Sequence, residues 1–118
     1  MSKRTIDDFI RERKELIENM SRYCGQDAKR FFHLDSQVYK DGALSAKMKE
    51  LLGLVASLVL RCDDCINYHL VNCHENGISD EELAEALTVG LIAGGSITIP
   101  HLRRAYAGWD ELKKGGKV

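Results

Sequence analysis

Two cysteines, a histidine and a glutamate are the residues of this chain whose types and spacing could carry out chemistry. Cys62 and Cys65 enclose two aspartates, and His69 follows four residues after the second cysteine. Glu50 lies twelve residues before the first cysteine and precedes an uncharged run at 51–60. Thiols beside an imidazole, a carboxylate and an apolar stretch are typical of sites where pKa values are shifted and thiol reactivity is controlled. We therefore expect a redox-active CxxC pair.

A metal site is the first alternative. Cys62, Cys65, His69, Cys73 and His74 are all zinc-ligand types, and a structural zinc takes four ligands. On one continuous helix, Cys62, Cys65, His69 and Cys73 would share one face. Cys62 and Cys73, the first and last of these four, would lie about 16 Å apart, at about 1.5 Å per residue. One ion with bonds of about 2.0–2.3 Å cannot span that distance, and the chain has no second CxxC. We therefore expect no metal.

Redox chemistry instead requires the cysteine pair to lie where a helix begins. There the backbone is free to let residues at i and i+3 form a disulfide, and the helix N-terminus stabilises a thiolate. Asp63 and Asp64 place like charge beside the thiols, so a proton acceptor has to help. His69 lies at i+4 from Cys65 on the same helix face, within reach directly or through a water. The spacing therefore predicts His69 as the base.

Glu50 can join this site only if the chain bends. On an unbroken helix Glu50 would lie about 18 Å from Cys62. A break at 61–63 would separate the helix that carries the apolar run from the helix that opens with the cysteines. The site therefore requires two helices that meet at the CxxC.

The remaining elements are also predicted to be helices. Capping residues, glycine turns and apolar spacing indicate about six of them. They are expected to begin after Thr5, at Gln26, after Ser45, at Cys62, after Ser79 and near Ile99. We expect a single all-α domain over 1–118, with N-terminal helices in 1–40 and a frayed tail at 115–118.

Other cysteines and histidines are expected to be structural. Cys24 and Cys73 are interpreted as small buried hydrophobic residues, the commonest role of a cysteine in a helical protein. His33, His74 and His101 are interpreted as ordinary polar residues. None of these five is expected in the site.

Composition and charge exclude several classes of protein. The chain has 118 residues with 17 basic and 18 acidic side chains, and no basic stripe interleaved with aromatic residues, so nucleic acid is a poor expectation. The longest uncharged run has ten residues, whereas a membrane span needs about 20. Four cysteines without an apolar signal segment argue against a framework of structural disulfides. A cytoplasmic protein without membrane or nucleic-acid partners is expected.

The segment around the cysteines resembles the carboxymuconolactone decarboxylase and alkylhydroperoxidase D-like family. The resemblance covers about 44–95 and includes the stretch NGISDEELAEA at 76–86. Its most specific part is four residues at the family's spacing: Glu50, Cys62, Cys65 and His69. The resemblance implies an all-helical protomer that assembles into trimers or hexamers and reduces hydroperoxides through the cysteine pair.

The resemblance also implies a role for each residue. Cys65 would be the thiolate that attacks the peroxide O–O bond and becomes a sulfenic acid. Cys62 would resolve it to a Cys62–Cys65 disulfide, which a thiol or dithiol partner would reduce, while Glu50 and His69 would relay protons. One position differs, because Asp64 stands where the hydroperoxidases carry a second histidine. A carboxylate there would raise the pKa of the neighbouring thiol and cannot act as an imidazole relay.

The expected function is a thiol-dependent hydroperoxide reductase, an antioxidant cysteine peroxidase that acts on a small hydroperoxide without a cofactor. Oligomerisation is expected because the apolar helices offer more hydrophobic surface than one small protomer covers, and the resemblance makes the oligomer a homotrimer or homohexamer. Three alternatives stay open. They are a dithiol–disulfide oxidoreductase or redox sensor without a peroxide step, a decarboxylase of a lactone acid, and a non-enzymatic assembly scaffold.

Overall fold

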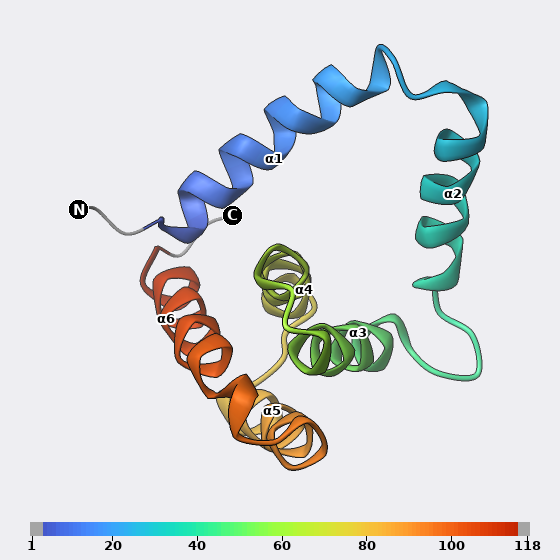
Figure 1. Cartoon of the computed structure of the whole chain (residues 1–118). Coiled ribbons are helices and arrows are strands. Elements are labelled where there is room, and N and C mark those ends of the chain that lie inside the picture. Colours follow the sequence, from blue (N-terminus) through green and yellow to red (C-terminus); the bar gives the residue numbers. More distant parts are fainter. Residues whose placement is uncertain (1–3, 116–118) are drawn as a thin grey trace.

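The computed structural model describes residues 4–115, and within this range the chain forms six α-helices and one 3₁₀ turn, with no strand (Figure 1). The elements are α1 (Ile6–Ser21), α2 (Gly25–Val38), α3 (Ala46–Leu60), α4 (Asp63–Glu75), α5 (Asp80–Gly94), the turn η1 (Ser96–Thr98) and α6 (Ile99–Gly115). The predicted all-α class is confirmed. Of the expected frayed tail, Gly115 is the last residue of α6, and 116–118 lie outside the described residues. None of the described helices is long and apolar enough to cross a membrane.

Local capping sets the starts of the helices. The Thr5 hydroxyl accepts the N–H of Asp8 at 3.0 Å, and the Asp8 carboxylate accepts the N–H of Thr5 at 3.0 Å. Ser79 and Glu82 form the same reciprocal pair at the start of α5, and the hydroxyl of Ser45 caps α3. Each such cap is worth about 1 kcal/mol. These three starts were predicted correctly from the sequence because capping depends on residues only three positions apart.

One hydrophobic core joins α3, α4, α5 and α6. In Figure 1, α3 lies between α4 and α5, and α6 runs alongside α4. The core's fully buried large side chains come from all four helices: Leu54, Leu58, Ile66, Leu70, Leu83, Leu87 and Leu112. The first turns of α1 add Ile6 and Phe9 to this cluster. The core therefore fixes α3 against α4, the two helices that carry the predicted site residues.

The N-terminal helices α1 and α2 form an arm that leaves this core. Figure 1 shows α1 and α2 passing around the outside of α3 and α4, and α2 buries none of its residues. The apolar side chains of α1 are buried only in the first half of this helix, at Ile6 and Phe9. The rest of the arm exposes large apolar side chains: Leu16, Ile17, Met20, Phe31, Phe32, Leu34 and Val38. Apolar surface of this extent is typical of a protein that assembles with other chains.

The two cysteines outside the CxxC differ in burial. Cys73 of α4 is fully buried in the core, and its expected role as a buried hydrophobic residue is confirmed. Cys24 is only half-buried, so the same expectation is wrong for it, because it lies on the arm, at the N-cap of α2. Burial raises the pKa of the Cys73 thiol to about 12, and the charge of Glu50 adds to the rise.

Because of Cys73, the free energy of unfolding should fall at alkaline pH. The unfolded thiol has an ordinary pKa near 9.0, so from there to about pH 12 the folded protein binds more protons than the unfolded chain. Stability is therefore lost as the pH rises, by at most about 1.4 kcal/mol per pH unit. Denaturant unfolding at about pH 8 and about pH 10.5 measures this loss, and Cys73→Ala should reduce it. The same pH dependence in both proteins would contradict a buried, protonated thiol.

Candidate functional site

The chain reverses its direction between α3 and α4, where a break at 61–63 was predicted. Arg61 takes a left-handed conformation (φ 60°, ψ 43°), and Cys62 is extended (φ −105°, ψ 98°). The N–H of Arg61 donates to the carbonyl of Leu58 at 2.9 Å, and that of Cys62 to the carbonyl of Ser57 at 3.1 Å. A left-handed non-glycine residue costs about 1–2 kcal/mol, which the packing of α3 on α4 offsets. The two helices therefore lie side by side instead of forming one rod.

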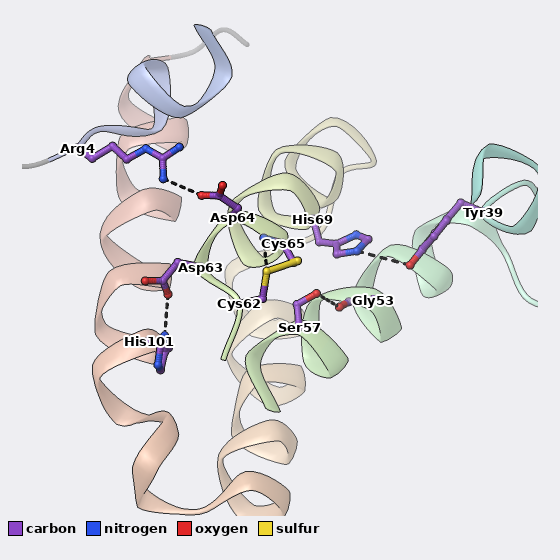
Figure 2. The surroundings of a disulfide bond; sticks show 10 residues. All are labelled: Arg4, Tyr39, Gly53, Ser57, Cys62, Asp63, Asp64, Cys65, His69 and His101. Carbon is purple, nitrogen blue, oxygen red and sulfur yellow. Dashed lines mark hydrogen bonds and ion pairs between the residues drawn. A yellow bond between two sulfur atoms is a disulfide. The ribbon is translucent and has the colours of Figure 1, made fainter. Parts of the chain in front are cut away.

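Cys62 and Cys65 are joined by a disulfide in the first turn of α4 (Figure 2). Their Cα atoms are 5.2 Å apart, and Cys62 is the N-cap, whose Sγ accepts the N–H of Cys65 at 3.2 Å. After reduction, the unpaired N–H groups and the dipole at this helix start would favour a thiolate. Cys65 is exposed and Cys62 half-buried. Cys65 is therefore the more accessible of the two residues for a molecule that approaches from solvent.

Glu50 of α3 and His69 of α4 meet in the buried layer between these helices. Each residue is 7% exposed, and Nδ1 of His69 lies 2.8 Å from Oε1 of Glu50. Because a carboxylate only accepts, we assign the proton of a neutral ring to Nδ1, which leaves a lone pair on Nε2. The bend thus brings together the two residues that a straight helix would hold apart.

Tyr39, which follows α2, is a neighbour of the imidazole that sequence reasoning missed. Its hydroxyl lies 3.5 Å from Nε2 of His69 (Figure 2). Glu50 contacts the other ring nitrogen, Nδ1. Gly53 of α3 makes room for this contact, because a Cβ there would lie 2.6 Å from Cε1 of His69 and 2.7 Å from the Tyr39 hydroxyl. The available signal was the glycine itself, which costs about 1 kcal/mol relative to alanine inside a helix. Its presence in the apolar α3 indicates a close approach by other groups.

Both aspartates between the cysteines are paired with cations. Nη1 of Arg4 donates to Asp64 at 2.7 Å, and Figure 2 shows this pair on one side of the disulfide. Nδ1 of His101 lies 2.7 Å from Asp63, and Nε of Arg104 donates to the same carboxylate at 2.9 Å. The cations offset the negative charge that was expected to oppose a thiolate. His101, interpreted from the sequence as an ordinary polar residue, therefore contacts an aspartate of the cysteine motif.

An open cavity of about 420 Å³ lies beside the disulfide, between the arm and the start of α4. Cys65 and His69 line the cavity from α4, and the arm supplies apolar walls: Phe9, Leu16, Ile17, Met20, Phe31 and Phe32. Arg13 also lines it, with its guanidinium 4.4 Å from the centroid of the Tyr68 ring. The sequence showed no arginine cluster, whereas the fold brings Arg4 and Arg13 to one cavity. A molecule in this cavity would lie against Cys65.

The residues weighed as zinc ligands do not converge. Cys73 lies in the core, and the ring of His74 packs edge-on against Trp109 with centroids 5.7 Å apart. Across residues 4–115, no three or more His, Cys, Asp or Glu side chains are arranged to hold a metal ion. The groups that can react here are the sulfurs and the imidazole.

Comparison with known proteins identifies relatives of this chain. The model of the carboxymuconolactone decarboxylase family matches residues 14–110. An uncharacterised protein of the cox locus of Paracoccus denitrificans is 29% identical over 70% of this chain and 74% of its own length. An uncharacterised protein of Cupriavidus necator is 32% identical over 62% of this chain and 65% of its own length.

Solved structures share the fold. A crystal structure of TM1620 from Thermotoga maritima has a TM-score of 0.89 and 56% identity, over 92% of this chain and 95% of that one. A second crystal structure of TM1620 (TM-score 0.85, 56% identity, 93% of this chain and 96% of that one) describes a carboxymuconolactone decarboxylase family protein with a suggested involvement in an antioxidative response. Apo-lpg0406 of Legionella pneumophila, at 23% identity over 90% of this chain and 95% of its own, has a TM-score of 0.84 and shows the fold alone. With the family model matched over most of its length, this chain belongs to the carboxymuconolactone decarboxylase family.

Proposed function

We propose that this protein is a thiol-dependent hydroperoxide reductase whose cysteine pair cycles between dithiol and disulfide. The observation that carries the proposal is a disulfide at a helix start, with the exposed Cys65 opening onto the same cavity as a buried, carboxylate-bound His69. A buried carboxylate and imidazole beside a disulfide are not required for two helices to pack. Ionisable groups buried in this way cluster at functional sites. The antioxidative role suggested for TM1620 agrees with this chemistry.

The first step oxidises Cys65. In the reduced protein the thiol gives its proton to Nε2 of His69 through a water, and the bond from Nδ1–H to Glu50 stabilises the resulting imidazolium. The thiolate then attacks the terminal oxygen of the hydroperoxide, and the O–O bond breaks. Cys65 becomes a sulfenic acid, and the other oxygen leaves as an alcohol with the proton returned by His69.

The second step restores a disulfide. The thiol of Cys62 attacks the sulfenic sulfur of Cys65, an S–S bond forms, and the hydroxyl group leaves with the thiol proton as water. A thiol or dithiol partner protein then supplies two electrons and two protons to reduce the pair. The spacing of the two cysteines suits this step because their Cα atoms are already 5.2 Å apart.

The surroundings of the site support a proposal for the class of substrate and for the assembly of the protein. Apolar and aromatic walls beside Cys65 fit the alkyl part of a small organic hydroperoxide better than a fully polar molecule. The uncovered apolar surface of the arm supports a homo-oligomer, which we propose to be a homotrimer or homohexamer. A reducing compartment such as the cytoplasm suits a pair that must be reduced in each cycle. We propose no nucleic-acid or membrane partner.

Dithiol–disulfide exchange without a peroxide step is the second candidate. Asp64 favours it, because a carboxylate stands where a second imidazole would assist peroxide cleavage. The exposed position of Cys65 would also admit a partner's disulfide. The two candidates share the cysteine pair and differ in the oxidant.

Thiol counting separates these candidates. Reduced protein should lose both thiols of the pair to an equimolar amount of an organic hydroperoxide, as measured with a chromogenic disulfide reagent. Cys65→Ser should abolish the loss, and Cys62→Ser should stop at a sulfenic acid that dimedone traps. Cys24→Ser, on the arm, is the matched control and should react as the parent protein does. Rapid oxidation by a small disulfide with none by hydroperoxide would favour the second candidate.

Replacing the buried carboxylate tests the proton relay. Glu50→Gln keeps the shape of the side chain but removes the charge that stabilises an imidazolium, so hydroperoxide should oxidise the thiols roughly tenfold to a hundredfold more slowly. Stopped-flow fluorescence or quenched thiol counting gives the rate. The matched control is Glu85→Gln, at an exposed position of α5, which should leave the rate unchanged. Equal rates for both variants would remove Glu50 from the mechanism.

A further inference from the structure

We propose that Tyr39 is a positioning residue of this site: its hydroxyl is the second hydrogen-bond partner of His69 and thereby increases the fraction of Cys65 present as thiolate in the reduced protein. This role rests on the proposed proton transfer from Cys65 to His69. It does not depend on the identity of the oxidant.

The backbone of Tyr39 is held in place from α3. The ammonium group of Lys49 donates to the carbonyl of Val38 at 2.8 Å and to the carbonyl of Lys40 at 2.7 Å, one residue to either side of Tyr39. These carbonyls lie at the C-terminal end of α2, where a helix favours a cation. Since α2 buries none of its own residues, this clamp and the Tyr39 side chain attach the end of the arm to the site.

The side chain of Tyr39 is equally constrained. Gly53 leaves the space in which the hydroxyl and the imidazole both approach α3, and a Cβ there would lie 2.7 Å from each of Oη of Tyr39 and Nε2 of His69. The two rings are tilted by 38° with centroids 5.3 Å apart. The phenol therefore points its oxygen at Nε2 of the ring, while Glu50 occupies Nδ1.

A phenol suits both protonation states of His69. An imidazolium carries two N–H donors and needs two acceptors. Glu50 accepts one, and the Tyr39 oxygen is placed to accept the other. This bond from a charged donor is stronger than the one that the same hydroxyl can donate to the neutral ring, so the hydroxyl favours the imidazolium. Burial, with the negative charges of Asp35 and Glu50, raises the pKa of Tyr39, so it stays a neutral phenol while the thiols titrate. Proton uptake by His69 then leaves no N–H unpaired in a buried place.

No other described group replaces this partner. The titratable and charged groups around the imidazole come from every neighbouring element. They are Arg4 and Arg13 from the region of α1, Asp35 from α2 and Tyr39 just after it, Glu50 from α3, and Asp64, Cys65 and Tyr68 from α4. The Tyr68 ring lies at 70° to the imidazole with centroids 5.0 Å apart, and the guanidinium of Arg13 lies over the Tyr68 ring. Among the described residues, only Tyr39 has a polar atom within hydrogen-bond distance of Nε2.

The test compares Tyr39→Phe with its parent by the rate at which iodoacetamide alkylates Cys65, followed across pH in a Cys62→Ser background. Only the thiolate reacts, so the rate follows the thiolate fraction. Losing the hydroxyl should slow alkylation about twofold to tenfold on the acidic side of the profile, the factor that one hydrogen bond supplies. The midpoint should move to higher pH, with the alkaline plateau unchanged. A change in plateau alone would mean that Tyr39 only controls access, and would overturn the proposal.

Two further variants and an internal reference guard against a folding artefact. Lys49→Met releases the backbone of Tyr39 without touching its hydroxyl and should shift the midpoint in the same direction by less. Tyr106→Phe removes a phenol hydroxyl from α6 and should leave the profile as it was. Alkylation of Cys24, on a separate tryptic peptide, should be equal in all variants.

Parental midpoints for both Tyr39→Phe and Lys49→Met would overturn the proposal. A shifted midpoint in a protein that does not react with hydroperoxide would leave this role standing and remove the peroxidase.

Discussion

A carboxylate and an imidazole in contact between two helices constrain the rest of this structure. Glu50 and His69 are each only 7% exposed, so each depends on the other and on a fixed distance between α3 and α4. That distance is held by the leucine-rich core, by the reversal at Arg61 and by the missing side chain at Gly53. Replacing such a pair with apolar side chains is often neutral or stabilising, so stability alone does not account for the presence of this pair.

The parts of the fold that were predictable from the sequence are those that depend on near neighbours. The capping pairs, the cysteines at a helix start and the required bend all follow from residues a few positions apart, or from the distance a straight helix would impose. Tyr39, Arg4 and His101 were missed because they reach the site across 30, 60 and 38 residues of chain. An apolar stripe shows which face of a helix is hydrophobic but not whether the same protomer covers it, so the exposure of the arm could not be read from near neighbours in the sequence.

Charge around the cysteines is set by parts of the chain that are far apart in sequence. Two aspartates inside the CxxC would make a poor setting for a thiolate if they stood alone. Arg4, His101 and Arg104 instead surround them, one from the segment before α1 and two from α6. The segment before α1 and the first half of α6 thus meet at the start of α4. A substitution in either segment would alter the electrostatics around the cysteines without changing the motif itself.

The disulfide joins two positions of α4 at which α1 and α5 carry a capping box. Thr5 with Asp8 and Ser79 with Glu82 join the residue before a helix to the third residue inside it through hydrogen bonds. Cys62 and Cys65 join the same two positions of α4 through a covalent bond. The disulfide therefore closes the first turn of α4 between the same two positions as a capping box, with a covalent bond in place of the hydrogen bonds. Reduction would release this covalent closure and leave the turn held by hydrogen bonds alone, such as the one from the Cys65 N–H to the Cys62 sulfur.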